Sequence, residues 1–443
     1  MTLTTRIASQ SPTRLIRQAA AERSRHRAVL AVAAASIVVL GWRITLPQGV
    51  EVGWIVAALL SPVWVRAVGR YRFGWLLVCL SLGTAVAGVW LRFANAATHG
   101  TNGLVFTTQT GIMIGAGLSI GLLLWARTLF SPSLVAILFG IGLLIGTDVQ
   151  NSAFQGNPWK FGFYYPVALI ALGLAHLTRR WWVELLVLVA LMLMCATHDF
   201  RSSFALLLLA AVLLIAQRPV LRVLHRGSTL LVLLGIAVAT VVVTFVGQAA
   251  ILGGLLGAET QARSIAQIET SGNLIVGSRP ELQATLALMQ NSLWGFGAGS
   301  APTGADIEIA KTGMRSIGYD PDNGYVNVYM LGNHFEVHSI FGDVWIQSGL
   351  VGLALIAALL VVLLGSTSRR IAQGTAPAAT LLMVVTTLWF VPFGPWFSSS
   401  PIVVIAVALL LEVKRRGGDA DRPRESSAEL PRWKRVAPGL SPD

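Results

Sequence analysis

The sequence predicts an all-α, polytopic integral membrane protein with about 12 transmembrane helices and one long outer loop. Of its 443 residues, 54% are hydrophobic and only 12% are charged, whereas a soluble domain carries roughly a quarter charged residues. The apolar residues also fall into blocks close to the length that crosses a bilayer as a helix, about 17–25 residues. Twelve blocks are present: 28–46, 50–66, 74–91, 104–126, 131–147, 162–178, 181–197, 202–217, 228–254, 340–364, 376–393 and 399–413.

These blocks divide the chain into five parts. They are a basic N-terminal tail (1–27), spans one to nine (28–254), the large outer loop (255–339), spans ten to twelve (340–413) and a tail rich in Arg, Pro, Ser and Asp that we expect to be disordered (414–443). The N-terminal segment is too long and too rich in arginine for a typical cleaved signal peptide, so we expect the first span to be an uncleaved anchor. Cys79 and Cys195 both fall within spans, and neither a disulfide framework nor a cysteine metal site is expected.

The basic residues predict the orientation. With the N-terminus inside, 25 of the 33 Lys and Arg residues fall in the two tails and the inner connections. The eight outer ones are Arg43, Arg92, Lys160, Arg201, Arg263, Arg279, Lys311 and Arg315. Because short inner loops are enriched in positive charge, we expect a multi-pass protein of the inner (cytoplasmic) membrane with both termini cytoplasmic. The same asymmetry accounts for the net charge of +13, so no nucleic-acid partner is expected.

The outer loop is long enough to carry structure of its own. Within RPELQATLALMQNSLWGFG, the apolar residues follow helical spacing: Leu282, Leu286, Leu288 and Met289. Pro280 suits the first helical turn and Ser278 suits the N-cap, so we expect a short amphipathic helix on the membrane face. The glycine-rich GFGAGS that follows lacks the Lys-Ser/Thr of a phosphate-binding P-loop and follows no strand. We interpret it as a tight turn.

Three outer polar residues are suited to chemistry on a lipid-linked phosphate. Arg201 begins span eight, Arg279 opens the loop helix and His338 precedes span ten. Each has a simpler interpretation, because an arginine at a span end can extend to the head groups and a lone interfacial histidine is commonly structural. Together they are more specific, since guanidinium groups bind phosphate oxygens through paired donors and an imidazole accepts protons near neutral pH. Asp199 and Asp343 are candidates for orienting these groups, or are solvated interface carboxylates.

The same segments resemble a known family. Arg201-Ser202-Ser203 leads into a helix, Ser278–Gly299 reads SR-x-x-L…ALM…LWGFGAG, and Val337–Leu353 reads VHS…QSGLVGL. This order resembles the O-antigen ligase and O-antigen polymerase superfamily, the WaaL-type and Wzy-type bacterial glycan transferases. The resemblance covers roughly spans seven to ten. The chain departs from the family pattern, which often has Pro, Asn and Glu, at three positions: Ser292, Ser339 and Gln347.

The resemblance implies a GT-C-like fold and a metal-independent, inverting membrane glycosyltransferase of cell-surface polysaccharide biosynthesis. Arg201 and Arg279 would hold the diphosphate of an undecaprenyl-linked glycan donor, with Asp199 and Asp343 beside them. His338 would accept the proton of the attacking hydroxyl, which a glycan, lipid or protein acceptor would supply. No cofactor is implied, and no outer Asp/Glu cluster in the sequence has the spacing of a metal site.

Other functions remain open from the sequence. Ligase and polymerase share the same motifs and chemistry, so the sequence does not separate them. Dolichol-type mannosyltransferases have a different sequence pattern, with acidic residues in the first outer loop. This chain has only Glu51 there. A transporter or lipid-linked oligosaccharide flippase tends to have internal repeats and ionisable groups at mid-membrane. This sequence has no clear repeat, and nearly all its charged residues lie at span ends.

The distribution of basic residues generates a topological prediction. We expect reporters fused after Gly257, in the outer loop, and after Gly418, in the C-terminal tail, to lie on opposite sides of the membrane. Paired alkaline phosphatase and fluorescent-protein fusions measure this. Reporters that both land on one side would contradict the predicted topology.

Overall fold

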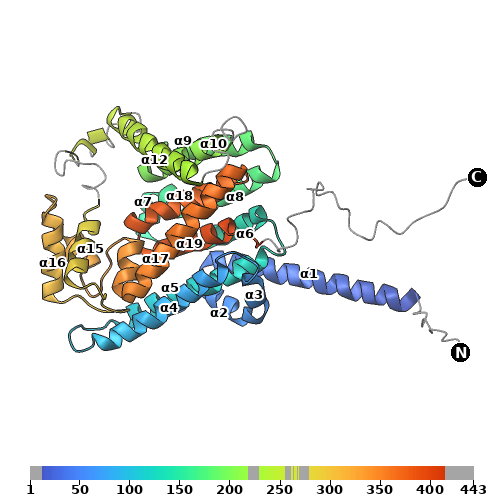
Figure 1. Cartoon of the computed structure of the whole chain (residues 1–443), viewed down its shortest axis with the longest axis horizontal. Helices are drawn as coiled ribbons and strands as arrows, with labels where there is room; N and C mark the ends of the chain where they lie inside the picture. The colour runs from blue at the N-terminus through green and yellow to red at the C-terminus, as the bar shows by residue number, and fades with distance from the viewer. Residues whose placement is uncertain are drawn as a thin grey trace, which may run out of the picture.

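The computed structural model describes residues 12–217, 229–254, 261–262, 264–266, 268 and 279–414. Within these residues every element longer than an isolated bridge is helical, which confirms the predicted all-α class. The isolated bridges pair Thr45 with Glu51, Tyr71 with Val413, and Thr101 with Ser300. Figure 1 shows the helices gathered into a bundle from which most of α1 projects.

The helices follow the predicted apolar blocks in order. Those that fall on the blocks are α1 (Pro12–Trp42), α2 (Val52–Leu59), α3 (Ser61–Val68), α4 (Gly74–Ala94), α5 (Gly103–Ala126), α6 (Pro132–Ile145), α8 (Tyr164–Leu177), α9 (Trp181–Thr197), α10 (Arg201–Ala216), α12 (Thr229–Leu252), α17 (Ile340–Gln373), α18 (Ala378–Phe393) and α19 (Trp396–Leu410). The connections carry α7 (Ser152–Gly156), the π-helical turn η1 (Trp159–Phe163), α15 (Glu281–Asn291), α16 (Gly304–Arg315) and the π-helical segment η2 (Tyr325–Met330).

Among the described residues, six helices are long and apolar enough to cross a membrane. They are Ala20–Trp42, Gly74–Ala94, Gly103–Ala126, Trp159–Leu177, Val232–Ala249 and Ile340–Gln373. Five apolar helices are shorter, of 10 to 17 residues: Pro132–Ile145, Trp181–Thr197, Arg201–Ala216, Ala378–Phe393 and Trp396–Leu410. By length and composition the chain is therefore suited to a membrane, and the number of twelve crossings stays a prediction.

Two elements differ from the sequence prediction. Helix α1 begins at Pro12 and not near residue 28, so a large part of the expected N-terminal tail is helical, with residues 20–29 exposed. The block 50–66, predicted as one span, is divided into α2 and α3 at Leu60, which has a ψ of 6°. Pro62 lacks the N–H that would continue the α2 hydrogen-bond ladder, and it is tolerated in the first turn of α3, where no such donor is needed. Each half is only eight residues long.

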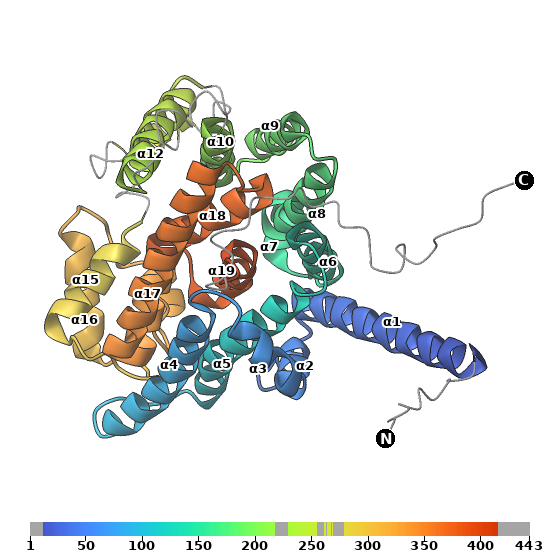
Figure 2. The ribbon, with the colours of Figure 1, turned by 45° about the vertical axis from the view of Figure 1, so that its right-hand side comes forward.

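Helix α19 occupies the centre of the bundle. It packs against α5, α6, α17 and α18, and Figure 2 shows it enclosed by these helices. Every residue from Ile402 to Leu410 is buried. A helix that is apolar on all sides belongs in the interior of a large protein or in a membrane. The sequence of α19 is apolar on all sides, which explains why this short helix lies in the interior of the bundle.

The glycine-rich loop 295–300 packs closely against α17 at the point where that helix bends. Helix α17 bends at Gly349, which has φ 54° and ψ −135°, and a Cβ there would lie 2.1 Å from the Trp294 carbonyl oxygen. The amides of Phe296 and Gly297 both donate to the carbonyl of Ile346, at 2.8 and 3.0 Å.

The next two amides of the loop are also used inside the protein. Ala298 donates to the Gly88 carbonyl of α4 at 3.0 Å, and Gly299 donates to Oε1 of Gln109 of α5 at 2.8 Å. A phosphate cradle needs free backbone amides. The amides of residues 296–299 all donate to groups of the protein, which agrees with the interpretation of the loop as a turn.

The outer loop builds a second hydrophobic core, which we call the outer module. It unites α15, α16, η2 and the non-helical segment 331–339, and Figure 1 shows α15 and α16 together beside α17. The apolar face of α15 buries Ala284 and Leu288 in this core, while Leu286 is 40% exposed. The amphipathic helix is therefore packed against protein, where the sequence analysis expected a membrane surface. The predicted cap, Ser278, lies outside the described residues.

The bend in α17 generates a stability prediction. We expect Gly349→Ala to lower the free energy of unfolding by roughly 2–6 kcal/mol, because the new Cβ meets the Trp294 carbonyl and the backbone angles suit only glycine. Gly365→Ala in the same helix is the matched control, since nothing lies within 4 Å of its Cβ position. Thermal unfolding of the purified variants in detergent measures the difference. Equal stability of the two variants would contradict a close contact between the bend at Gly349 and the glycine-rich loop.

Candidate active site

The segment HFEVH, residues 334–338, lines one side of the site. Its middle residues, 335–337, have no helical structure, and the apolar Phe335 and Val337 are buried in the outer module at 3% and 0% exposure. Glu336 between them lies close to both histidines. Nε2 of His334 lies 3.3 Å from Oε2 of Glu336, and Nε2 of His338 lies 3.9 Å from Oε1 of the same carboxylate.

His338 turns the chain into α17. It has φ 50°, a conformation uncommon outside glycine, and Ser339 behind it caps the helix by accepting from the Gly342 amide at 2.9 Å. Nδ1 of His338 lies 3.3 Å from the carbonyl oxygen of Glu336. Because a carbonyl can only accept, this contact favours the tautomer with the proton on Nδ1. Nε2 then carries the lone pair and can take up a proton.

Two tyrosines of η2 flank the imidazole. The ring centroids of Tyr325 and Tyr329 lie 5.6 and 5.5 Å from that of His338. The two phenol rings are nearly parallel, with an interplanar angle of 15° and centroids 6.2 Å apart. Tyr329 is 57% exposed, so its face is open to a ligand. The three rings form a short aromatic platform at the surface of the outer module.

The first turn of α15 completes the cluster. The Tyr325 hydroxyl donates to Oε1 of the buried Glu281 at 2.6 Å. Burial, together with the charge and hydrogen bond of Glu281, raises the pKa of the Tyr325 phenol, while the positive charge of Arg279 opposes the shift. The phenol therefore stays a donor. Oε2 of Glu281 is buried and has no hydrogen-bond partner within the described part of the chain.

Arg201 lies at the start of α10. Its Nη1 donates to the buried hydroxyl of Ser264 at 2.7 Å, and its Nε lies 4.0 Å from Oδ1 of Asp199. Asp199 has φ 48° and forms the turn between α9 and α10. These contacts link Arg201 to the first part of the outer loop. The charge of Arg279 acts on Tyr325, whose ring lies beside that of His338, whereas Arg201 contacts a different segment.

Asp343 has both carboxylate oxygens occupied by backbone amides. Oδ1 accepts from Val337 at 3.0 Å and Oδ2 accepts from Trp396 at 2.8 Å. The side chain is buried, and it joins the residue before His338 to the first residue of α19. This geometry holds the histidine turn in place.

Sequence reasoning missed five residues of the site: Glu281, Tyr325, Tyr329, His334 and Glu336. The alternation in HFEVH was a visible signal for Glu336, because this acid lies two residues from each histidine. Glu281 was visible only as an acid in the first turn of a predicted helix. Tyr325 had no local signal, since tertiary packing alone brings η2 to His338.

Metal-ligand candidates are scarce in the part of the chain that the structure describes. No group of three or more His, Cys, Asp or Glu side chains there could hold a metal ion. The two cysteines, Cys79 and Cys195, are both free thiols.

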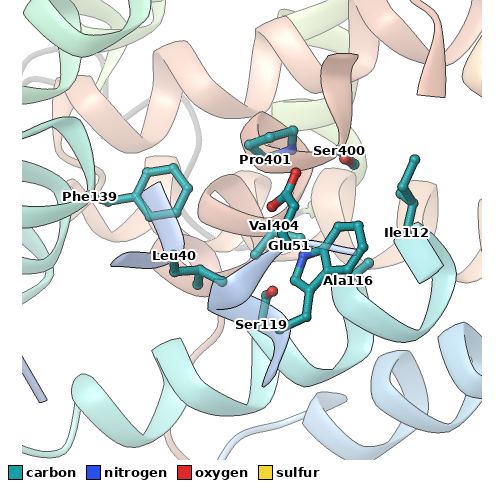
Figure 3. A pocket seen from close by; sticks show the side chains of 10 residues that line it. Leu40, Glu51, Ile112, Ala116, Ser119, Phe139, Ser400, Pro401 and Val404 are labelled. Carbon is teal, nitrogen blue, oxygen red and sulfur yellow. The ribbon is translucent and has the colours of Figure 1, made fainter. Parts of the chain in front are cut away.

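Glu51, the acid of the first outer loop, lies at a separate small cavity (Figure 3). Its Oε1 accepts from Nε of Arg43 at 2.9 Å, and Nη2 of Arg43 donates to the Phe397 carbonyl at 3.5 Å. Pro401, four residues after Phe397, has no N–H to bond that carbonyl. The cavity holds about 20 Å³, room for about one water molecule. Glu51 is thus neutralised, and the cavity is too small for a sugar.

Comparison with models of protein families, with curated proteins and with solved structures finds no match to this chain.

The Tyr325–Glu281 contact generates the next prediction. We expect Tyr325→Phe to destabilise the outer module by about 1–3 kcal/mol, because it leaves a buried carboxylate without its hydroxyl donor. Tyr329→Phe, which keeps an aromatic ring four residues away at a more exposed position, should unfold like the wild type. Thermal unfolding in detergent compares them. A Tyr325→Phe protein as stable as Tyr329→Phe would contradict a structural hydrogen bond at this site.

Proposed function

We propose that the protein transfers a glycan from an undecaprenyl-diphosphate-linked donor to an acceptor hydroxyl at the outer face of the cytoplasmic membrane. The observation that carries this proposal is one cluster, drawn from three segments of the outer loop. Arg279 lies just before α15, Glu281 is the first residue of α15, Tyr325 comes from η2 and His338 from the turn into α17. The cluster unites a cation, an aromatic platform and a base where a long apolar helix begins.

The two arginines bind the diphosphate leaving group and stabilise its charge. As the bond between the anomeric carbon and the diphosphate oxygen breaks, the electron pair stays on the lipid diphosphate. Arg279 is partly exposed and lies beside the cluster, so its guanidinium can donate to the diphosphate oxygens in a paired fashion. Arg201 is the second candidate donor. Its bond to Ser264 holds it on the outer-loop segment, and Asp199 orients it from 4.0 Å.

His338 serves the acceptor. Its Nε2 takes the proton of the acceptor hydroxyl while the hydroxyl oxygen bonds to the anomeric carbon. The resulting imidazolium is balanced by the Glu336 carboxylate 3.9 Å away. Direct displacement of this kind inverts the anomeric centre. Asp343 acts as a positioning residue, because its oxygens hold the backbone on both sides of the turn.

The aromatic platform and Glu281 bind sugar. Pyranose rings have apolar faces that stack on aromatic side chains, and the exposed face of Tyr329 offers such a surface. Oε2 of Glu281 is a buried acceptor without a partner among the described residues, and a sugar hydroxyl can supply the donor. This pair of features favours a carbohydrate over a purely lipid substrate.

The wider assignments belong to the same proposal. They are a GT-C-like arrangement, twelve membrane crossings and cytoplasmic termini, with either an O-antigen ligase or a polymerase type of transfer. A transporter or flippase is the alternative. The lack of a clear internal repeat and the position of nearly all charged residues at span ends favour the transferase over it.

The cluster generates a kinetic prediction. We expect His338→Ala to slow transfer by roughly 10²–10⁴, the usual share of a general base, and Arg279→Ala by about 10²–10³. Arg279→Lys should not restore the rate, because lysine loses the paired donors. The assay follows transfer from purified undecaprenyl-diphosphate-linked glycan by membranes in the presence of EDTA, normalised to protein level.

Arg315→Ala is the matched control. Arg315 also lies on the outer module, but it is 42% exposed and pairs with Glu308 and Asp322, so we expect near-normal transfer. Arg201→Ala reports whether the second arginine acts on the same diphosphate. Near-normal transfer by His338→Ala would refute the catalytic assignment, and a histidine that only starts a helix would then be the better interpretation.

A further inference from the structure

A second polar site lies at the opposite end of α17 from His338. It is a cavity of about 640 Å³ where the C-terminal ends of α5, α17 and α19 meet. The charged residues that line it are Arg72, Arg127, Arg369, Arg370, Glu412 and Lys414. A volume of this size is typical of ligand pockets, which span about 300–1,000 Å³. We call it the basic cavity.

Helix dipoles do not balance the charge of the basic cavity. Its lining carries five basic residues and one acid, an excess of four positive charges. Three helix C-termini supply a partial charge of about −0.5 each. An excess of roughly two to three positive charges is left over. Basic residues at inner helix ends are expected from topology alone, but that rule does not require them to converge on a cavity.

The guanidinium groups of the cavity keep unused donors. Nη1 of Arg127 donates to the carbonyls of Ala408 and Leu411 at the end of α19, at 2.5 and 2.6 Å. Its Nε is buried and has no partner among the described residues, and the same holds for Nε of Arg369. The nearest carboxylate, Glu412, lies 3.9 Å from Nε of Arg369 and 3.8 Å from Nε of Arg370, too far for hydrogen bonds.

We propose that the basic cavity binds a phosphate-bearing anion with about two negative charges. Arginine donors that converge on one partly open cavity suit phosphate oxygens, and the ligand can be the head group of an anionic phospholipid or a free phosphate compound. The chain's own C-terminal segment is a poor occupant, because residues 415–443 contain seven basic and five acidic residues. This site does not depend on the proposed glycan transfer.

The test measures lipid binding to the full-length protein in detergent. Fluorescent cardiolipin, which carries two phosphates, is titrated against wild type and against the double variant Arg369→Gln/Arg370→Gln. Each positive charge near a lipid phosphate contributes a factor of about five in affinity, so the double variant should bind roughly 30-fold more weakly. Arg66→Gln is the matched control. Arg66 lies near the C-terminal end of α3, exposed and outside the cavity lining, so affinity should stay near the wild-type value.

Competition identifies the source of the phosphate. Displacement of cardiolipin by phosphatidylglycerol but not by inorganic pyrophosphate assigns the cavity to a lipid head group. Pyrophosphate binding that the double variant loses, without saturable cardiolipin binding, assigns it to a free phosphate compound. If the double variant does not fold, Arg72→Gln replaces it, with an expected loss of about fivefold. No saturable binding of either probe, or equal losses in Arg66→Gln, would overturn the proposal.

Discussion

The carbonyl of Ile346, released where α17 bends at Gly349, accepts two amide hydrogen bonds from the glycine-rich loop. In a membrane no water is present to satisfy a freed backbone group, and leaving it unpaired costs several kcal/mol. Bend and loop therefore depend on each other. The loop reaches Ile346 only because Gly295 and Gly297 have positive φ and no side chain. Helix α17 can keep its bend only while the loop donates these hydrogen bonds to Ile346.

This joint fixes the outer module on the membrane helices. The loop leads from α15 into α16, so its seat on α17 sets where the first turn of α15 lies. From the other direction, Asp343 joins the Val337 and Trp396 amides and so fixes the turn at His338 relative to α19. Glu281 and His338 are thus held by two separate attachments to the same helix. Rigid support of this kind is what a site needs if its groups are to keep productive geometry.

The sequence predicted the parts of this arrangement that depend on local pattern. Apolar blocks located almost every apolar helix, and the spacing of Leu282, Leu286, Leu288 and Met289 marked α15, because these features follow from periodicity and length. Pro62 was visible, yet its effect on α2 and α3 was overlooked. The meeting of Tyr325 with His338 could not be predicted, since it depends on how η2 packs in the outer module. The same limit applies to Arg201, whose partner Ser264 is 63 residues away along the chain.

Helix α17 connects the two polar sites and also keeps them apart. Its 34 residues rise about 50 Å at 1.5 Å per residue, before the bend is considered. Across that separation, two unit charges interact by only about 0.3 kcal/mol at an effective dielectric constant of about 20. The charges of Arg369 and Arg370 therefore exert little direct field on His338. Any influence of the basic cavity on the outer cluster would have to pass through the position of α17 itself, and the contact of Gly349 with Trp294 is the point at which such a shift would reach the outer module.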